Sequence, residues 1–220
     1  MKKSISVLIL LALVTTGAFA QIGLSAGGGL LFDGNFGDGL EGKMGSVKHS
    51  QTKDTISFGG FVFFDATYAE IDIAFLYGTT SFKSDPKDPD DNRGKWTSMQ
   101  LGFSLLGKYP IEMGPVTIFP LLGINYNMLL EVKDKDGKKI KDNEYFKLKE
   151  QHQLGFLAGV GVDYPLNDNL YLRGEALFSL RLPSKSTEDY IKNAKDSGAT
   201  DVTPLLGLGP RIKVGVGYRF

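Results

Sequence analysis

IKVGVGYRF, residues 212–220, places an apolar or aromatic side chain at every second position. The side chains between them are small or charged: Lys213, Gly215, Gly217 and Arg219. This alternation predicts a β-strand with one apolar face. A soluble domain has no evident use for an aromatic residue at a chain end, which frays, whereas a strand in lipid faces hydrocarbon on one side. The stretch therefore predicts the closing strand of a β-barrel that sits in a membrane.

With this strand, the sequence resembles the bacterial outer-membrane β-barrel proteins. The resemblance implies that Tyr218 and Phe220 belong to the signal that the barrel-assembly machinery reads. It further implies that periplasmic chaperones, that machinery and outer-membrane lipid are the partners of the chain.

The first 20 residues have the features of an export signal. Lys2 and Lys3 precede an apolar run over residues 5–14, and a small-x-small cleavage site follows at residues 18–20. The run is shorter than the roughly 20 residues that a spanning helix needs, which disfavours an uncleaved membrane helix. We therefore expect a signal peptide over 1–20, a mature chain over 21–220 forming one barrel domain, and the outer membrane as its location.

Composition narrows the function classes. Lys plus Arg and Asp plus Glu both number 25, so nothing in the charge balance calls for nucleic acid as a partner. The chain has no cysteine, which rules out a lipoprotein anchor, disulfides and thiol chemistry. A mean hydropathy of −0.09 suits a membrane barrel, in which apolar and polar residues alternate and average out.

Period-two alternation recurs in eight segments. They span about 22–32, 55–66, 70–78, 96–109, 116–128, 152–164, 170–182 and 206–220. The connections alternate between long (33–54, 79–95, 129–151, 183–205) and short (67–69, 110–115, 165–169). Bacterial membrane barrels have short periplasmic turns and long outer loops. The pattern predicts an all-β fold, an eight-stranded antiparallel transmembrane β-barrel with short periplasmic turns and long extracellular loops.

A soluble eight-stranded barrel of the lipocalin kind is the competing architecture, with its apolar face turned inward. Three features favour the membrane: alternating loop lengths, aromatic residues at strand ends, and glycine on the non-apolar face, which suits a narrow interior. Pro120 and Pro210 interrupt two predicted strands. Because proline removes a ladder donor and a closed barrel has no edge, we expect β-bulges there.

The inward face carries both charged and apolar side chains. We predict a lumen charge cluster of Asp65, Asp72, Lys108, Arg173, Glu175, Arg211 and Lys213. Antiparallel pairing of residues 182 and 206 sets Glu175 opposite Lys213, and predicts an ion pair of Glu175 with Lys213 or Arg211. Such pairs either plug the lumen or line a gated polar path.

The apolar lumen set consists of Phe61, Phe63, Phe119, Leu157 and Leu177. These side chains either pack within a plug or form a pocket for a hydrophobic molecule.

Over residues 21–220 the chain is similar to small eight-stranded outer-membrane barrels of the OmpW and OmpX type, in strand count, loop pattern and the ending at 218–220. OmpW-like relatives imply a narrow channel or carrier for small, including hydrophobic, molecules, with a small-molecule ligand. OmpX-like relatives imply a pore-less barrel whose surface loops serve adhesion or envelope integrity. We expect a monomer without cofactors.

An outer-membrane hydrolase is a third possibility. His49 and His152 are the two histidines, and neither has a nucleophile at a motif spacing, so we expect no enzyme and no catalytic residue. Asp88, Asp90 and Asn92 match the first three ligands of a helix-loop-helix calcium loop, but Arg93 and Met99 stand in place of its Gly and Glu. We therefore expect no metal site.

Deleting Phe220 should hinder assembly, because the resemblance assigns this residue to the assembly signal. The fraction of chain inserted in the outer membrane, followed by heat-modified gel mobility, measures the effect. Normal insertion of the shortened chain would contradict the assignment.

Overall fold

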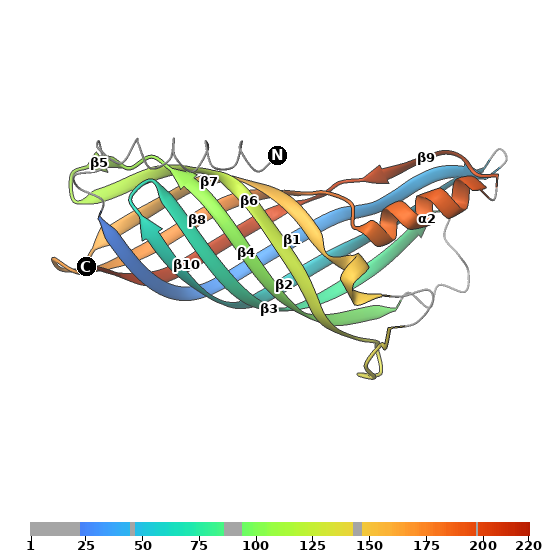
Figure 1. Cartoon of the computed structure of the whole chain (residues 1–220), viewed down its shortest axis with the longest axis horizontal. Coiled ribbons are helices and arrows are strands. Elements are labelled where there is room, and N and C mark those ends of the chain that lie inside the picture. Colours follow the sequence, from blue (N-terminus) through green and yellow to red (C-terminus); the bar gives the residue numbers. More distant parts are fainter. Residues whose placement is uncertain (1–22, 45–46, 86–93, 143–146, 197) are drawn as a thin grey trace, which may run out of the picture.

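The computed structural model describes residues 23–44, 47–85, 94–142, 147–196 and 198–220, so the predicted signal peptide lies outside the described residues. Within these ranges, eight long strands form the wall of a barrel (Figure 1). They are β1 (Leu24–Met44), β2 (Val47–Ala66), β3 (Ala69–Asp85), β4 (Lys95–Lys108), β6 (Val116–Lys133), β7 (Gln153–Pro165), β8 (Leu170–Arg181) and β10 (Gly207–Arg219). Each pairs antiparallel with its neighbours, and β10 closes the ring on β1, with Gly29 opposite Gly215.

Four shorter elements lie between these strands: β5 (Ile111–Met113), the 3₁₀ helix η2 (Leu148–Gln151), α2 (Lys185–Asp196) and β9 (Thr200–Leu205). β5 folds back on the start of β6 at the end of the barrel where the C-terminus lies. α2 and β9 lie at the opposite end (Figure 1). Among the described residues, no helix is both long and apolar enough to cross a membrane.

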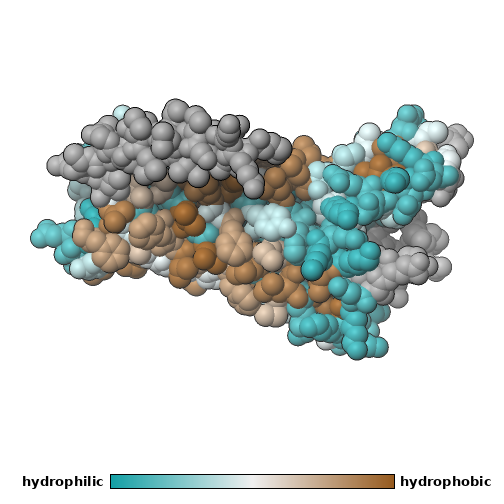
Figure 2. Space-filling view, viewed as in Figure 1, coloured by the Kyte–Doolittle hydropathy of each residue, from teal (hydrophilic) through white to brown (hydrophobic). Residues whose placement is uncertain are grey.

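The outer surface of the wall is apolar. Along each strand, exposed apolar side chains alternate with buried ones, and Leu30, Leu122 and Val214 are 74%, 70% and 61% exposed. The apolar surface covers the part of the barrel nearer the C-terminus, and polar residues cover the end that carries α2 (Figure 2). A lipocalin-like barrel would have the reverse arrangement, so the prediction of a membrane-facing barrel is confirmed.

Glycines on the inner face make room for aromatic rings. A methyl group on Gly161 would come within 2.1 Å of the Phe119 ring, and one on Gly217 within 2.1 Å of the Tyr171 ring. A barrel of eight strands is just wide enough for side chains to fill it. Large rings therefore fit only where the neighbouring strand has no side chain.

The prediction of bulges at the two prolines is wrong. Pro120 lies opposite Val160 and Pro210 opposite Phe178, with no shift of register at either. On the other side of Pro120, β4 has already ended at Lys108. Because no strand pairs with Pro120 there, its missing N–H costs no backbone hydrogen bond on that side. Next to Pro210, the β1–β10 ladder lacks the pairs between Asp33 and Phe36 while keeping its register. The wall therefore accommodates proline by omitting bonds rather than by adding a residue.

All four predicted long loops contain regular structure. Residues 33–44 and 47–54 continue β1 and β2 as a hairpin, β3 continues to Asp85, and β6 continues to Lys133. Residues 183–205 hold α2 and β9 instead of a polar loop. The predicted ends followed the apolar alternation, which stops where strands leave the lipid, whereas backbone pairing continues beyond it.

The strands beyond the apolar band form an outer extension, which we define as residues 35–44, 47–55 and 79–85 with α2 and β9. β9 pairs with β1 along Gly39–Lys43, and the register of β1 on β2 shifts between Asn35 and Asp38. Asp54 accepts hydrogen bonds from Lys83 Nζ (2.5 Å) and from the Gly37 amide (3.0 Å). Partial burial raises the pKa of Asp54, but these contacts outweigh it and hold the pKa below its ordinary value.

Gly59→Ala should destabilise the barrel by about 1–3 kcal/mol, because an added Cβ would come within 1.8 Å of the Phe75 carbonyl oxygen on β3. The matched control is Gly60→Ala on the outer face of the same strand, where the nearest atom is 3.6 Å away. Urea unfolding in micelles, followed by fluorescence of Trp96, measures both. Equal stability of the two variants would contradict the close packing at Gly59.

Candidate functional site

The inner half of the lumen, towards the C-terminus, is organised around Arg173 of β8. Its Nε and Nη2 donate to the two carboxylate oxygens of Asp163 at 2.8 and 2.7 Å, a bidentate pair. Nη1 donates to Glu70 Oε2 and Nη2 also to Asp65 Oδ2, each at 2.6 Å. Arg173 is 1% exposed, so three carboxylates compensate one fully buried guanidinium.

Lys213 of β10 forms the second centre. Its Nζ lies 3.0 Å from Glu70, 2.8 Å from Asp72 and 2.7 Å from Glu175. Glu175 is the direct cross-strand partner of Lys213, at the register that the sequence predicts. Arg211, the predicted alternative partner, lies with Nη2 3.9 Å from Asp72 Oδ1. Glu70 joins the two centres because its carboxylate contacts both Lys213 and Arg173.

Lys108, the remaining predicted lumen cation, is ion-paired with Asp65 and lies over the Phe119 ring at 4.6 Å. Arg173 lies over the Phe63 ring at 4.5 Å and over the rings of Phe119 and Tyr171 at 5.1 Å each. The charges are therefore enclosed by aromatic faces, which attract cations.

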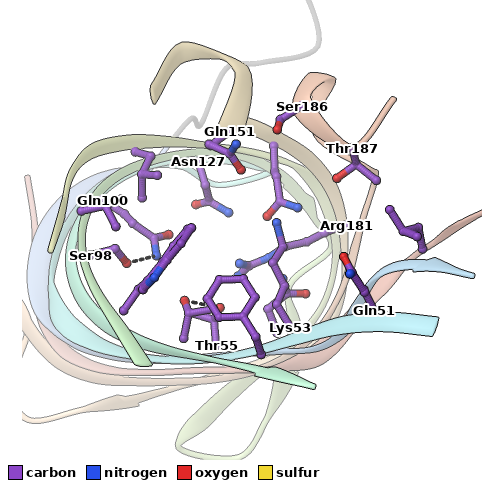
Figure 3. A pocket seen from close by; sticks show the side chains of 18 of the residues that line it. Gln51, Lys53, Thr55, Ser98, Gln100, Asn127, Gln151, Arg181, Ser186 and Thr187 are labelled. Carbon is purple, nitrogen blue, oxygen red and sulfur yellow. Dashed lines mark hydrogen bonds between the residues drawn. The ribbon is translucent and has the colours of Figure 1, made fainter. Parts of the chain in front are cut away.

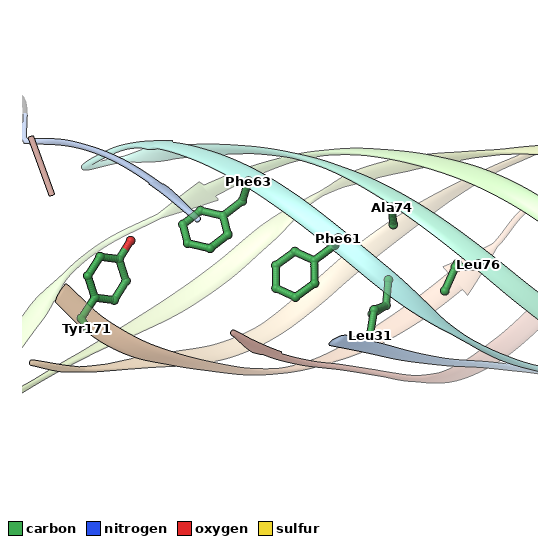
Figure 4. Packing of buried hydrophobic residues seen from close by; sticks show 6 residues of the cluster. All are labelled: Leu31, Phe61, Phe63, Ala74, Leu76 and Tyr171. Carbon is green, nitrogen blue, oxygen red and sulfur yellow. The ribbon is translucent and has the colours of Figure 1, made fainter. Parts of the chain in front are cut away.

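Buried apolar side chains complete this half of the lumen in two clusters. One contains Leu31, Phe61, Phe63, Ala74, Leu76 and Tyr171. The other contains Leu106, Phe119, Leu121, Leu157 and Leu177. The first cluster extends along the barrel axis, with Tyr171 at one end and Leu76 at the other (Figure 4). We call these two clusters and the ion pairs of Arg173, Lys213 and Lys108 the plug.

The outer half of the lumen holds a cavity of about 360 Å³. We call it the outer cavity, and its lining is mostly amide and hydroxyl side chains around the barrel opening (Figure 3). The wall strands contribute the amide, hydroxyl, charged, aromatic and aliphatic side chains of Asn35, Leu40, Gln51, Lys53, Thr55, Thr80, Phe82, Trp96, Ser98, Gln100, Asn127, Leu129, Val132, Gln153 and Arg181, and η2 contributes Gln151. Ser186, Thr187 and Tyr190 of α2 line it on the outer side.

Local sequence explains how asparagines reach into this space. A Cβ on Gly207 would lie 2.0 Å from Asn35 Oδ1, and one on Gly102 would lie 3.0 Å from Asn127 Oδ1. Each amide thus occupies the place that a side chain on the neighbouring strand would take. Asn35 is 3% and Asn127 5% exposed, yet Asn35 Oδ1 and both amide atoms of Asn127 have no hydrogen-bond partner among the described residues.

The cations at the outer cavity are paired with carboxylates. Lys53 Nζ lies 3.1 Å from Asp38 Oδ2, which also accepts a 2.5 Å hydrogen bond from Gln153. Arg181 is ion-paired with Asp33. Each of these positive charges is therefore balanced within the wall.

Sequence reasoning located the plug and missed the outer cavity. The seven predicted charged residues take part in the buried ion pairs, and the five predicted apolar residues belong to the two buried clusters. None of the twelve lines the outer cavity. Asp33, Asn35, Asp38 and Lys53 fell in a predicted loop, although Asp33, Asn35 and Lys53 continue the period-two spacing of the inner faces of β1 and β2. Asp38 follows the register shift in β1, so the spacing could not have placed it on the inner face. Glu70 was missed although it shares the inward face of Asp72.

Among the described residues, none of the other candidates lines the outer cavity or belongs to the plug. His152 Nδ1 is 3.0 Å from the hydroxyl of Tyr126, and the two rings pack edge to face at 5.8 Å. The side chain of His49 and the residues 86–93, which include Asp88 and Asp90, lie outside the described residues. Tyr218 and Phe220 pack edge to face at 5.5 Å near the closing strand's end.

Comparison with known proteins gives one family match. The model of the outer membrane protein beta-barrel domain matches residues 6–220. A comparison with curated proteins gave no match.

Similar solved structures include the Escherichia coli outer membrane protein W, with 14% identity, a TM-score of 0.45, and 91% of this chain and 98% of that chain covered. A major outer membrane protein of Thermus thermophilus shows 18% identity, a TM-score of 0.43, and coverage of 89% and 99%. Ail, the attachment invasion locus protein of Yersinia pestis, shows 12% identity, a TM-score of 0.37, and coverage of 91% and 100%.

Lys213→Met should lower the free energy of unfolding by about 3–5 kcal/mol, because it leaves Glu70, Asp72 and Glu175 without their shared cation. The matched control is Lys43→Met, which removes a pair with Asp201 whose side chains are 54% and 70% exposed and should cost less than about 1 kcal/mol. Adding Glu175→Gln to Lys213→Met should recover part of the loss. A loss below about 1 kcal/mol for Lys213→Met alone would show that the plug is not held by this pair.

Proposed function

Because the chain belongs to the family of outer-membrane β-barrel domain proteins, it is an integral outer-membrane barrel, and we propose that it is a pore-less one that acts through its outer end. The observation that carries this proposal is the plug. Arg173 and Lys213 are 1% and 0% exposed, and together they engage five carboxylates from β2, β3, β7 and β8.

A path for ions would have to separate these pairs. Removing one partner from a buried ion pair typically costs about 3–5 kcal/mol. Glu70 contacts both Arg173 and Lys213, so displacing either cation also disturbs an ion pair of the other. The plug therefore favours a closed lumen over the narrow channel.

The predicted apolar lumen residues support the same conclusion. Phe61 and Phe63 stack on each other at 5.9 Å, and Phe119 packs with Leu157 and Leu177. These contacts are those of a packed core, and they favour packing within the plug over a pocket or carrier path for hydrophobic molecules.

The outer extension supports a role at the cell surface. It has regular structure beyond the apolar band, and Ile191 of α2 and Val202 of β9 are buried within it. Of the roles expected from the sequence, surface adhesion or envelope integrity fits an ordered outer end above a closed lumen. We propose a non-catalytic protein, because His152 is hydrogen-bonded to a tyrosine, and among the described residues it has neither a carboxylate to orient it nor a serine that it could activate.

Planar-bilayer recordings of refolded 21–220 should show no discrete openings, because the plug blocks the lumen. Heat-modified gel mobility confirms that the silent protein is folded. Steady openings from folded protein would contradict the closed lumen and favour a channel.

Replacing residues 185–196 by a short Gly-Ser linker should abolish the surface role while leaving membrane insertion unchanged. Adhesion to host-cell matrix and survival in bile salts measure the two forms of that role. If neither changes although the wild-type protein supports one of them, the outer extension is not the functional end.

A further inference from the structure

We propose that the outer cavity binds an uncharged glycosyl unit, a sugar of one or two rings. The inference rests on the proposed function, since it makes the cavity above the plug the place where the closed barrel meets its ligand. The cavity, of about 360 Å³, lies within the range of roughly 300–1,000 Å³ that is typical of small-molecule sites.

The first step is the hydrogen-bonding capacity of the wall. Asn127 is 5% exposed, and its amide nitrogen and oxygen both lack a partner among the described residues, as does Asn35 Oδ1. A carboxamide offers donors and an acceptor side by side, which is what two neighbouring hydroxyl groups of a sugar require. Buried amides without partners are costly, so a ligand that satisfies them gains the corresponding free energy.

The second step is the balance of charge. Lys53 is paired with Asp38 at 3.1 Å, and Arg181 is paired with Asp33. A negatively charged ligand would have to displace a carboxylate that already holds its cation. Arg181 Nε, which has no partner among the described residues, is one further donor that a neutral hydroxyl can use. The wall therefore favours an uncharged polar ligand over a phosphate, sulfate or carboxylate.

The third step is the aromatic part of the lining. Phe82 of β3 and Trp96 of β4 lie edge to face with ring centroids 4.5 Å apart, and Tyr190 comes from α2. Rings of this kind combine apolar contact area with fixed geometry. A sugar ring has a face of C–H groups and an edge of hydroxyls, so it can pack on an aromatic side chain while its hydroxyls reach the amides.

The fourth step is the position of α2 over the cavity. The helix begins after Ser184, which is 1% exposed and whose Oγ caps the Thr187 amide at 3.4 Å. Gly198 follows the helix with a left-handed φ of +90°, and its amide donates to the Lys195 carbonyl at 3.0 Å. Both ends are thus defined, and Ser186, Thr187 and Tyr190 line the cavity as its outer wall (Figure 3 labels Ser186 and Thr187).

The test uses the one tryptophan of the chain, which lines the cavity. Refolded 21–220 in a zwitterionic detergent without a sugar headgroup is titrated with glucose, galactose, maltose and lactose, and Trp96 fluorescence is recorded. At least one of these neutral sugars should give a saturable change. Glucuronate and glucose 6-phosphate, titrated in the same way, should bind about tenfold more weakly than the best neutral sugar.

Two variants place the response in the cavity. Asn127→Leu removes both unpartnered amide atoms and should weaken binding about tenfold or more. Thr80→Val removes only a hydroxyl, which is hydrogen-bonded to Thr55 at 2.8 Å, and should also weaken sugar binding. It serves as the test if Asn127→Leu does not fold. Its matched control is Thr79→Val, the exposed neighbour in β3, which should bind like the wild-type protein.

The source of the sugar is distinguished by repeating the titration in outer-membrane vesicles with and without long surface polysaccharide. Loss of the response only in vesicles that carry polysaccharide identifies a surface glycan as the occupant. A response in both identifies a free sugar. Each result supports the assignment of the cavity.

A folded barrel whose Trp96 responds to no neutral sugar, or that prefers the charged sugars, would overturn the inference. The outcome is separable from that of the proposed function. A silent barrel without a sugar response removes only the inference. A conducting barrel with a response that Asn127→Leu weakens removes the closed lumen and leaves the sugar site.

Discussion

The cost of burying charge in a barrel only eight strands wide governs this structure. Arg173 and Lys213 cannot stay inside the lumen without carboxylates, and those carboxylates come from strands on different sides of the ring. β3 and β10 are not neighbours, yet Glu70 and Asp72 of the first meet Lys213 of the second. The ion pairs therefore connect opposite sides of the barrel wall. A register shift of one residue in any of these strands would turn a charged side chain from the lumen towards lipid.

The same constraint divides the lumen into two parts with different chemistry. Where charges, rings and aliphatic side chains interlock, the interior is filled, and glycines such as Gly161 and Gly217 supply the space that the rings need. Beyond the plug, the lining changes to amides and hydroxyls, and side chains such as Asn35 and Asn127 leave hydrogen-bonding atoms unused among the described residues. The outer half of the lumen, together with α2 and β9, is the part of the barrel for which we propose a role in recognition.

Period-two alternation located all eight membrane strands, because lipid on one side and a narrow lumen on the other impose opposite demands on successive residues. It also set Glu175 opposite Lys213, since a single correct register propagates along a pair of strands. Alternation did not predict the outer ends of β1, β2 and β3, because outside the lipid these strands continue without an apolar face. It also missed α2, for which Ser184 before the helix and Gly198 after it were the available local signals.

The sequence by itself determined the strand count, the direction of each side chain in the membrane and the identity of the lumen charges. These follow from neighbours along the chain and from the polarity of the surroundings. Only the tertiary structure decided which charges meet across the lumen, that Glu70 links two cations, and that two prolines pass without bulges. It alone brought Asn35, Trp96, Asn127 and α2 around one cavity. Distances across a closed ring depend on the tilt and closure of all its strands together, and no local pattern contains them.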